Sequence, residues 1–158
     1  MPICYIGLGA NLNNPKEQLH LALQALAQLP HSQLRRTSSF YASHPQGPQD
    51  QPDYVNAVAE LETSLPPLAL LDALQQQERD QGRIKLRHWG ERCIDLDILL
   101  YDDLQLNSER LTVPHCELKN RSFVVEPLLE LRPDLILPDG MPLKDVQPEF
   151  IGELRRIN

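Results

Sequence analysis

The chain has 158 residues, of which 41% are hydrophobic and 23% are charged, and its formal net charge is −7. This length allows one domain with a sizeable core, but not comfortably two. The acidic balance argues against a general binder of nucleic acids or anionic membranes, which would need a basic face, and no segment reaches the roughly 20 apolar residues that span a bilayer.

The first predicted elements are a buried strand over residues 2–9 and an amphipathic helix over residues 13–30. The strand ends in "GLGAN", whose glycine spacing differs from that of a dinucleotide-binding turn. The helix carries one apolar stripe, formed by residues at three- and four-residue spacing: Leu19, Ala22, Leu23, Leu26 and Leu29.

Two further strands are predicted over residues 33–43 and 52–63, separated by a proline-rich loop that is too long for a tight hairpin. Residues 64–82 predict a second helix, and residues 93–103 predict a fourth strand. The order strand, helix, strand, strand, helix, strand is that of the α+β, ferredoxin-like βαββαβ core. We therefore expect an antiparallel sheet with the helices packed on one face.

Beyond this core we expect an irregular C-terminal extension. It contains one short predicted helix in "EPLLEL", residues 126–131, and one small hairpin around Pro138, Asp139 and Gly140. With no internal repeat in the sequence, we expect residues 1–158 to form a single domain.

The most informative feature is a pair of carboxylates inside an apolar run. Asp95 and Asp97 are two residues apart on a predicted strand, so they point to one face and leave the backbone about 6.6 Å apart. The opposite face should carry the core residues Ile94, Leu96, Ile98 and Leu100. Aspartate oxygens without a nearby Cys or His favour Mg²⁺ over zinc. The alternative is a half-exposed strand whose polar side faces water.

Cationic residues gather before and after this pair. A local cationic cluster in an acidic protein suggests a small anionic ligand, and carboxylates beside Arg and Lys are typical of phosphoryl transfer. A solvated charged loop is the alternative. Eight of the 15 Lys and Arg residues fall in this part of the chain: Arg79, Arg83, Lys85, Arg87, Arg92, Arg110, Lys119 and Arg121.

Several other side chains admit two interpretations. Tyr54 and Asn56 share one face of the third strand and could bind a flat heterocycle, or could be a core aromatic and a solvated amide. Glu78 is either an exposed acid or a residue that orients an arginine. His115 could donate to a phosphate, and Phe123 could stack on a ligand, although both are common as ordinary core or surface residues.

Three segments together resemble a known family: residues 40–58, 89–103 and 109–131. They are similar to the 6-hydroxymethyl-7,8-dihydropterin pyrophosphokinases of folate biosynthesis, most specifically in the W-G-x-R-x-x-D-L-D-I-L pattern. The resemblance runs from the first strand to the predicted hairpin. It implies a ferredoxin-like enzyme that transfers the β,γ-diphosphate of ATP to the pterin hydroxymethyl group and releases AMP.

The resemblance also implies roles for individual residues. Asp95 and Asp97 would hold two Mg²⁺ ions and act in catalysis with Arg83 and Arg92, and the loop with Arg83, Lys85 and Trp89 would close over the reactants. The implied pterin-binding residues are Ser43, Pro45, Tyr54, Asn56, Trp89 and Phe123. The implied ATP-binding residues are Gln75, Glu78, Lys85, Arg92, Ile98, Arg110, Thr112, His115 and Arg121.

Some positions differ from the family pattern. Lys85 stands where Arg is common, and Cys116 stands where Tyr is common. The remaining departures lie in the two long loops: His44, Gln46, His88 and Glu91. These differences concern loop closure and nucleotide contacts, and they leave the carboxylate pair unchanged.

Two other functional classes remain open from the residues alone. One is a metal-dependent nucleotidyltransferase or phosphohydrolase, and the other is a ferredoxin-like RNA-binding or ligand-sensing domain. Aromatic residues make up only 5% of this acidic chain, which argues against RNA binding. We expect small-molecule substrates only, a monomer, and no nucleic-acid or membrane partner. The three cysteines form no C-x-x-C pair, so a reducing cytoplasmic location is the default.

Overall fold

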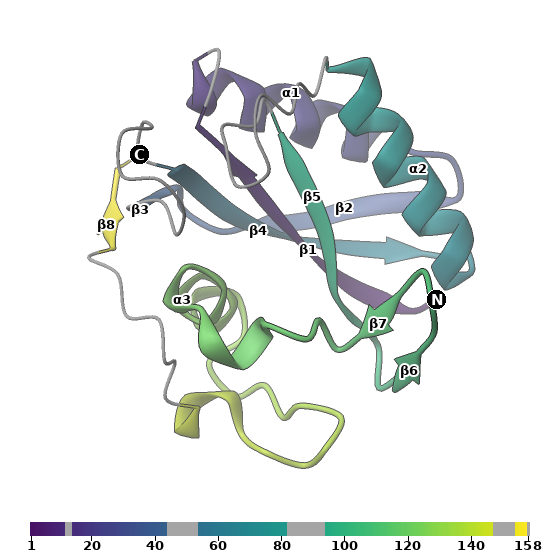
Figure 1. Ribbon diagram of the computed structural model, residues 1–158, viewed down its shortest axis with the longest axis vertical. Helices are drawn as coiled ribbons and strands as arrows, with labels where there is room; N and C mark the ends of the chain where they lie inside the picture. Colours follow the sequence, from purple (N-terminus) through teal and green to yellow (C-terminus); the bar gives the residue numbers. More distant parts are fainter. Residues whose placement is uncertain (12–13, 44–53, 82–93, 147–153, 158) are drawn as a thin grey trace.

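The computed structural model describes residues 1–11, 14–43, 54–81, 94–146 and 154–157. Its main sheet is antiparallel, with the strand order β5-β1-β4-β3-β8, and β2 also pairs with β4 (Figure 1). Its strands are β1 (Ile3–Ala10), β2 (Ser32–Thr37), β3 (Tyr41–Ser43), β4 (Tyr54–Thr63), β5 (Asp95–Tyr101) and β8 (Arg155–Arg156).

Within the described residues, the other elements are three helices, two 3₁₀ turns and a small hairpin. Their bounds are α1 (Pro15–Ala27), α2 (Pro67–Asp80), α3 (Ser122–Leu131), η1 (Leu118–Asn120), η2 (Leu143–Asp145), β6 (Leu106–Asn107) and β7 (Thr112–Val113). The predicted α+β, ferredoxin-like class is confirmed. Among the described residues, none of the helices combines the length and the apolar character needed to cross a membrane.

The second predicted strand, residues 33–43, is divided into β2 and β3. Both pieces pair with β4, but the ladder is interrupted at Ser38, whose side-chain oxygen accepts the Val58 N–H at 2.9 Å. The chain therefore stays beside β4 across the interruption. This division moves β3, which ends at Ser43, to the end of the sheet where β4 begins.

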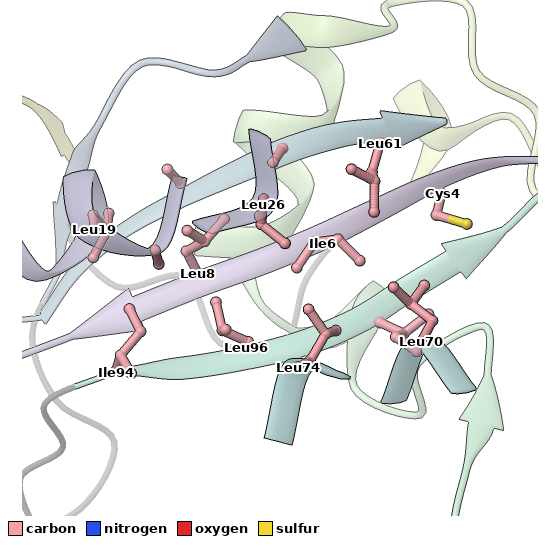
Figure 2. Close-up of a cluster of buried hydrophobic side chains, with 14 of the residues drawn as sticks. Cys4, Ile6, Leu8, Leu19, Leu26, Leu61, Leu70, Leu74, Ile94 and Leu96 are labelled. Atoms are coloured by element: carbon pink, nitrogen blue, oxygen red, sulfur yellow. The ribbon is translucent and has the colours of Figure 1, made fainter. Parts of the chain in front are cut away.

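One face of the sheet is covered by α1 and α2. Figure 2 shows Leu26 of α1 beside Ile6 of β1 and Leu74 of α2 beside Leu96 of β5, all in one cluster of buried side chains. The predicted stripe of α1 is confirmed, because Leu19, Ala22 and Leu26 are buried and Leu23 and Leu29 pack against the same cluster.

The opposite face is covered by α3, which extends the helix predicted at residues 126–131 to Ser122. Val125 and Leu128 of α3 are buried against Val58 and Leu99 of the sheet in a second hydrophobic cluster. The expectation of helices on one face therefore holds for α1 and α2 alone. Because α3 is apolar along most of its length, it needs the second sheet face for burial.

The core face of β5 differs from the prediction at one residue. Ile94, Leu96 and Ile98 lie in the cluster beneath α1 and α2, as predicted, but Leu100 lies in the α3 cluster. The pairing with β1 shifts register between Ile98 and Leu100, and such a bulge reverses the alternation of the residues that follow. The predicted hairpin near Pro138 is confirmed by the bridge between Ile136 and Pro142.

Candidate active site

The two aspartates are the first and third residues of β5. They lie on the sheet face that α3 covers nearer the end of the strand. Asp95 pairs with Gly9 of β1, and Asp97 pairs with Gly7. Opposite residues of an antiparallel ladder point to the same face, and a side chain at Gly7 would touch Leu99 of the α3 cluster. Asp95 is partly buried and Asp97 is exposed. The predicted face for the pair is therefore confirmed.

A row of paired residues runs from this acid across the sheet. Gly9 pairs with Asp95 on one side and with Asn56 of β4 on the other, and Asn56 in turn pairs with Tyr41 of β3. Because Gly9 has no side chain, the space between the Asp95 carboxylate and the Asn56 amide is not filled from β1. A Cβ atom at Gly9 would lie 3.0 Å from Asn56 Oδ1.

The Asn56 amide is oriented by its neighbour on β3. Its Nδ2 donates to Ser43 Oγ at 2.8 Å, and both residues are buried. Ser43 pairs with Tyr54, which lies two residues before Asn56 on the same face. Three of the predicted pterin-binding residues are thus adjacent at one end of the sheet.

Glu78 reaches the carboxylate strand from α2. Its Oε2 accepts the backbone N–H of Leu96 at 2.8 Å, between Asp95 and Asp97. Among the described strands, β5 is the last on this side of the main sheet, so Glu78 bonds a backbone N–H of an edge strand. Glu78 therefore occupies a ladder position at the sheet edge, an arrangement that neither interpretation of its sequence position anticipated.

The segment after β7 runs along the same edge. The His115 N–H donates to the Leu99 carbonyl at 2.9 Å, which holds the residue beside β5. His115 Nδ1 accepts the Glu117 N–H at 3.1 Å, so the neutral ring carries its proton on Nε2. This arrangement leaves Nε2–H as the donor of the ring. Thr112 is close in the chain, and its hydroxyl donates to Asn107 at 3.3 Å.

Arg110 and Gln75, both predicted to bind ATP, are in contact. The Arg110 guanidinium donates to Gln75 Oε1 at 3.3 Å and to Asp72 Oδ1 at 2.6 Å. Both charged side chains are about half exposed, so this pair is one that a bound phosphate can exchange with.

Arg121 and Phe123 stand at the start of α3. The Arg121 guanidinium carbon lies 5.6 Å from the centroid of the Phe123 ring, a cation–π arrangement. Arg121 Nε is buried and has no hydrogen-bond partner among the described residues, although Glu117 Oε2 approaches to 3.9 Å. A buried donor in this state is suited to an anionic ligand.

Ile98 differs from the other predicted ATP-binding residues, because its side chain is buried in the core beneath α1 and α2. Only its backbone is available to the edge of the sheet. Five predicted site residues lie outside the described residues: Pro45, Arg83, Lys85, Trp89 and Arg92. The family departures at His44, Gln46, His88 and Glu91 lie outside them too, whereas Cys116 is described and exposed.

Sequence reasoning overlooked Gly7, Gly9 and Tyr41. The glycines were considered only as a dinucleotide-binding turn, yet their two-residue spacing matches that of Asp95 and Asp97 on the neighbouring strand. That shared spacing was the available signal, since glycines opposite paired acids leave the acids uncovered.

In the described part of the chain, the two acids do not belong to a larger cage of metal ligands. Within the described ranges, no group of three or more His, Cys, Asp and Glu side chains is placed to hold a metal ion. Two carboxylates without a Cys or His ligand in such a group suit Mg²⁺, which keeps several water and phosphate ligands, better than a structural zinc.

The described part of this α+β domain combines an acidic pair on a strand with histidine and arginine donors, a set of groups typical of phosphoryl-transfer enzymes. Comparison with known families identifies the member. The chain belongs to the 7,8-dihydro-6-hydroxymethylpterin-pyrophosphokinase (HPPK) family, whose model matches residues 5–133. The predicted family and its enzyme activity are confirmed.

Two relatives match this chain along most of their length. A 2-amino-4-hydroxy-6-hydroxymethyldihydropteridine pyrophosphokinase from Haemophilus influenzae is 56% identical over 150 residues, which are 95% of this chain and 94% of the relative. The enzyme of the same name from Pseudomonas aeruginosa is 50% identical over 142 residues, 90% of this chain and 88% of the relative.

Solved structures show the same fold. The crystal structure of Plasmodium falciparum HPPK-DHPS wild type with pteroate matches 92% of this chain with a TM-score of 0.72 at 12% identity. The match covers 41% of that longer chain, so this protein spans less than half of it. At this identity the likeness shows the fold alone.

Proposed function

We propose that the chain transfers the β,γ-diphosphate of ATP to the hydroxymethyl group of 6-hydroxymethyl-7,8-dihydropterin, giving AMP and the pterin diphosphate. Its family and its relatives support this reaction. The observation that carries the proposal is the row from Asp95 through Gly9 to Asn56, which brings an acid and a heterocycle-reading amide onto one sheet face.

The pterin subsite is formed at the end of β3 and β4. Asn56, held by Ser43, pairs its amide with the hydrogen-bonding edge of the ring, since a buried amide in a fixed orientation is selective for one donor–acceptor pattern. Tyr54 and Phe123 stack on the two ring faces. Pro45 and Trp89, which lie outside the described residues, complete the subsite by family resemblance.

The nucleotide subsite follows the outer edge of β5. His115 donates from Nε2, and Arg110 and Arg121 neutralise phosphate charge. Gln75 and Thr112 line the same side, and their roles follow from family resemblance. Ile98 contributes backbone groups, because its side chain is in the core.

Glu78 has a positioning role in this proposal. Its bond to the Leu96 N–H fixes the backbone between the two aspartates, so that both carboxylates keep one direction. Glu78 supports ATP binding indirectly in this way. Arg83, Lys85 and Arg92 are assigned to loop closure and charge stabilisation by resemblance alone, and they lie outside the described residues.

Asp95 and Asp97 fit a magnesium site of two ions. They are hard oxygen donors on one face, Asp97 is exposed, and the glycines opposite them on β1 carry no side chain. When bound there, Mg²⁺ supplies charge neutralisation along the triphosphate and a fixed geometry for its oxygens. Arginine and histidine donors of the chain spread the remaining negative charge.

The chemistry needs no covalent intermediate. The pterin hydroxyl oxygen forms a bond to the β-phosphorus, the bond from that phosphorus to the AMP oxygen breaks, and the hydroxyl proton is released. The residues of this chain act by holding the two substrates in line and excluding water as a competing acceptor. Catalysis is therefore positioning plus electrostatic stabilisation.

We further propose a monomer with one domain over residues 1–158, located in the cytoplasm. β8 near the C-terminus pairs with β3, so both ends of the chain belong to one sheet. Burial raises the pKa of the Cys4 thiol to about 12, with a smaller contribution from Asp102, which suits an unreactive structural thiol. Light scattering of the purified protein tests the monomer.

The carboxylate assignment is tested with Asp97→Asn, assayed with ATP, Mg²⁺ and the hydroxymethyl dihydropterin for AMP and pterin diphosphate. We expect turnover to fall by about 10²–10³-fold or more, because a charge-stabilising ligand of the transferred group is lost. Asp97 is exposed, so the thermal unfolding midpoint should change little. Asp103→Asn, an exposed acid just beyond β5, is the matched control and should keep wild-type turnover.

Three outcomes would contradict the proposal. Wild-type turnover in a folded Asp97→Asn variant would remove the metal assignment. Release of diphosphate or free phosphate in place of AMP with pterin diphosphate would point to a nucleotidyltransferase or phosphohydrolase, and binding without turnover would point to a sensor.

A further inference from the structure

One largely buried carboxylate outside the assigned site, that of Glu130, accepts several hydrogen bonds. Glu130, in the last turn of α3, accepts the Ser39 N–H with both oxygens at 3.0 and 3.1 Å. It also accepts the Ser39 hydroxyl at 3.0 Å and the Tyr41 hydroxyl at 2.5 Å. Only a quarter of its side chain is exposed, so these are bonds to a largely desolvated charge.

These bonds join α3 to the strand beside the proposed pterin subsite. Tyr41 is the residue opposite Asn56 in the β3–β4 ladder, and Ser43, two residues further along β3, accepts the Asn56 amide. The Glu130 carboxylate therefore acts on the first residue of a three-residue strand that ends at the residue holding Asn56.

The other side of β3 is closed by β8. Arg156 pairs with Tyr41, its guanidinium donates to the Tyr41 hydroxyl at 3.0 Å, and its carbon lies 5.5 Å from the Tyr41 ring centroid. Arg156 also forms an ion pair with Glu130 at 3.5 Å. The Ile157 N–H donates to the Phe40 carbonyl at 2.9 Å. β3 is thus fixed by β4, β8 and α3 together.

The opposite end of α3 carries Phe123 and its partner Arg121. α3 has ten residues, about 15 Å, and Val125 and Leu128 on either side of its internal Pro127 are buried against the sheet, so an anchor in its last turn restrains the position of its first turn. Phe123 belongs to α3, the helix that contains Glu130. Asn56 is hydrogen-bonded to Ser43 of β3, the strand whose Tyr41 donates to Glu130. A single carboxylate therefore connects the elements on the two sides of the pterin subsite.

We propose that Glu130 is a positioning residue for the pterin subsite, which sets the spacing between Phe123 on α3 and the Ser43–Asn56 pair on the sheet. This inference rests on the proposed function. Substrate orientation is sensitive to small displacements, since a shift of about 1 Å at the reacting groups costs up to about 10²-fold in rate.

The test is Glu130→Ala, with the pterin and ATP varied separately in steady-state assays and with pterin affinity measured directly by its fluorescence. We expect kcat/KM for the pterin to fall about tenfold and its Kd to rise in parallel, while KM for ATP stays within about twofold. Glu130→Gln keeps the size and one acceptor oxygen, so it should recover part of the loss.

Glu126→Ala is the matched control, because Glu126 is exposed on the same helix. It should leave both substrates unaffected. Tyr41→Phe removes one hydroxyl from the cluster and should give the same selective effect on the pterin at about two- to threefold. This variant decides the question if Glu130→Ala does not fold.

A purely structural Glu130 would give a lower unfolding midpoint with unchanged pterin kcat/KM and Kd in both Glu130→Ala and Tyr41→Phe, and that result would overturn the inference. Equal losses for ATP and the pterin would overturn it too. Failure of the proposed function is a separate result, in which the wild-type chain does not convert the pterin at all.

Discussion

At the residue scale, the site depends on two glycines, which place no side chain on its face of the sheet. Gly7 and Gly9 of β1 stand opposite Asp97 and Asp95, and Gly9 also stands opposite Asn56. In a strand, glycine costs about 0.5–1 kcal/mol relative to alanine, so its use here has to be offset by what it allows. The gain is that no side chain of β1 lies between the acid pair and the Asn56 amide.

Substitution of each glycine by alanine separates an effect on pterin binding from an effect on stability. In Gly9→Ala the new methyl group would lie 3.0 Å from Asn56 Oδ1, so the amide has to move by a few tenths of an ångström. We expect KM for the pterin to rise about tenfold, with a change in the free energy of unfolding below about 1 kcal/mol.

Gly7→Ala is the comparison, since its methyl group would meet only the flexible Leu99 side chain at 3.3 Å. It should change stability by a similar amount and leave KM for the pterin unchanged. Steady-state kinetics and urea unfolding of both variants provide the measurement. Equal effects of the two substitutions on the pterin would contradict the role assigned to Gly9.

Single residues were predictable where a local period determines their direction. Asp95 and Asp97 share a face because every second residue of a strand does. The contact of Glu78 with the Leu96 N–H was not predictable, because it depends on how α2 docks against the edge of β5. Tyr41 and Glu130 meet over 89 positions of sequence, and no local pattern marks such a pair.

At the element scale, periodicity identified both core helices and the order of the main strands. It missed the division of residues 33–43 at Ser38, where a side-chain hydrogen bond replaces the ladder. It also missed β8, because a two-residue strand has no period of its own and forms only by pairing with β3. α3 was predicted too short, since it begins at Ser122 and continues through Pro127, a residue that is unfavourable inside a helix.

The helix layer gives a direct test of the first core. Leu74 of α2 is 1% exposed and lies against the sheet in Figure 2, whereas Leu68 of the same helix is 43% exposed. Leu74→Ala removes buried methyl groups and leaves a cavity, so the free energy of unfolding should fall by about 2–5 kcal/mol. Leu68→Ala should change it by less than about 1 kcal/mol.

Urea unfolding at constant temperature measures both values. The m-value should be unchanged in each variant if only stability has changed. Comparable losses in the two variants would mean that α2 is not oriented with Leu74 toward the sheet.

At the scale of the whole molecule, one charged network connects the sheet to the C-terminal third. Glu60 of β4 accepts the Tyr5 hydroxyl at 2.6 Å and two bonds from the Arg36 guanidinium at 2.9 and 3.1 Å. Arg132, just after α3, donates to the same Tyr5 hydroxyl at 3.1 Å. The network therefore joins β1, β2, β4 and the end of α3 on one face.

This network makes the stability of the protein sensitive to acid. The hydrogen bonds from Arg36 lower the pKa of the Glu60 carboxyl from its ordinary 4.5, against the opposing effect of burial, and the Tyr5 hydroxyl lowers it further. Burial raises the pKa of Glu130, but the bonds from Tyr41 and Ser39 outweigh it, so that pKa is lowered as well. In both cases the unfolded chain binds the proton first as the pH falls.

The stabilisation from these lowered pKa values is complete above about pH 4.5 and is lost as the pH falls through the folded-state pKa. Glu60→Gln should reduce the free energy of unfolding at pH 7 by about 1.5–3 kcal/mol, because hydrogen bonds to a charged group are lost. Its difference from wild type should shrink as the pH is lowered below about 4.5.

Glu62→Gln, which removes the partly exposed pair with Arg35, should cost less than about 1 kcal/mol at pH 7. Urea titrations from pH 7 to pH 3 give these values, and a Glu60→Gln difference that stays constant across that range would show that the ionised carboxylate does not stabilise the fold.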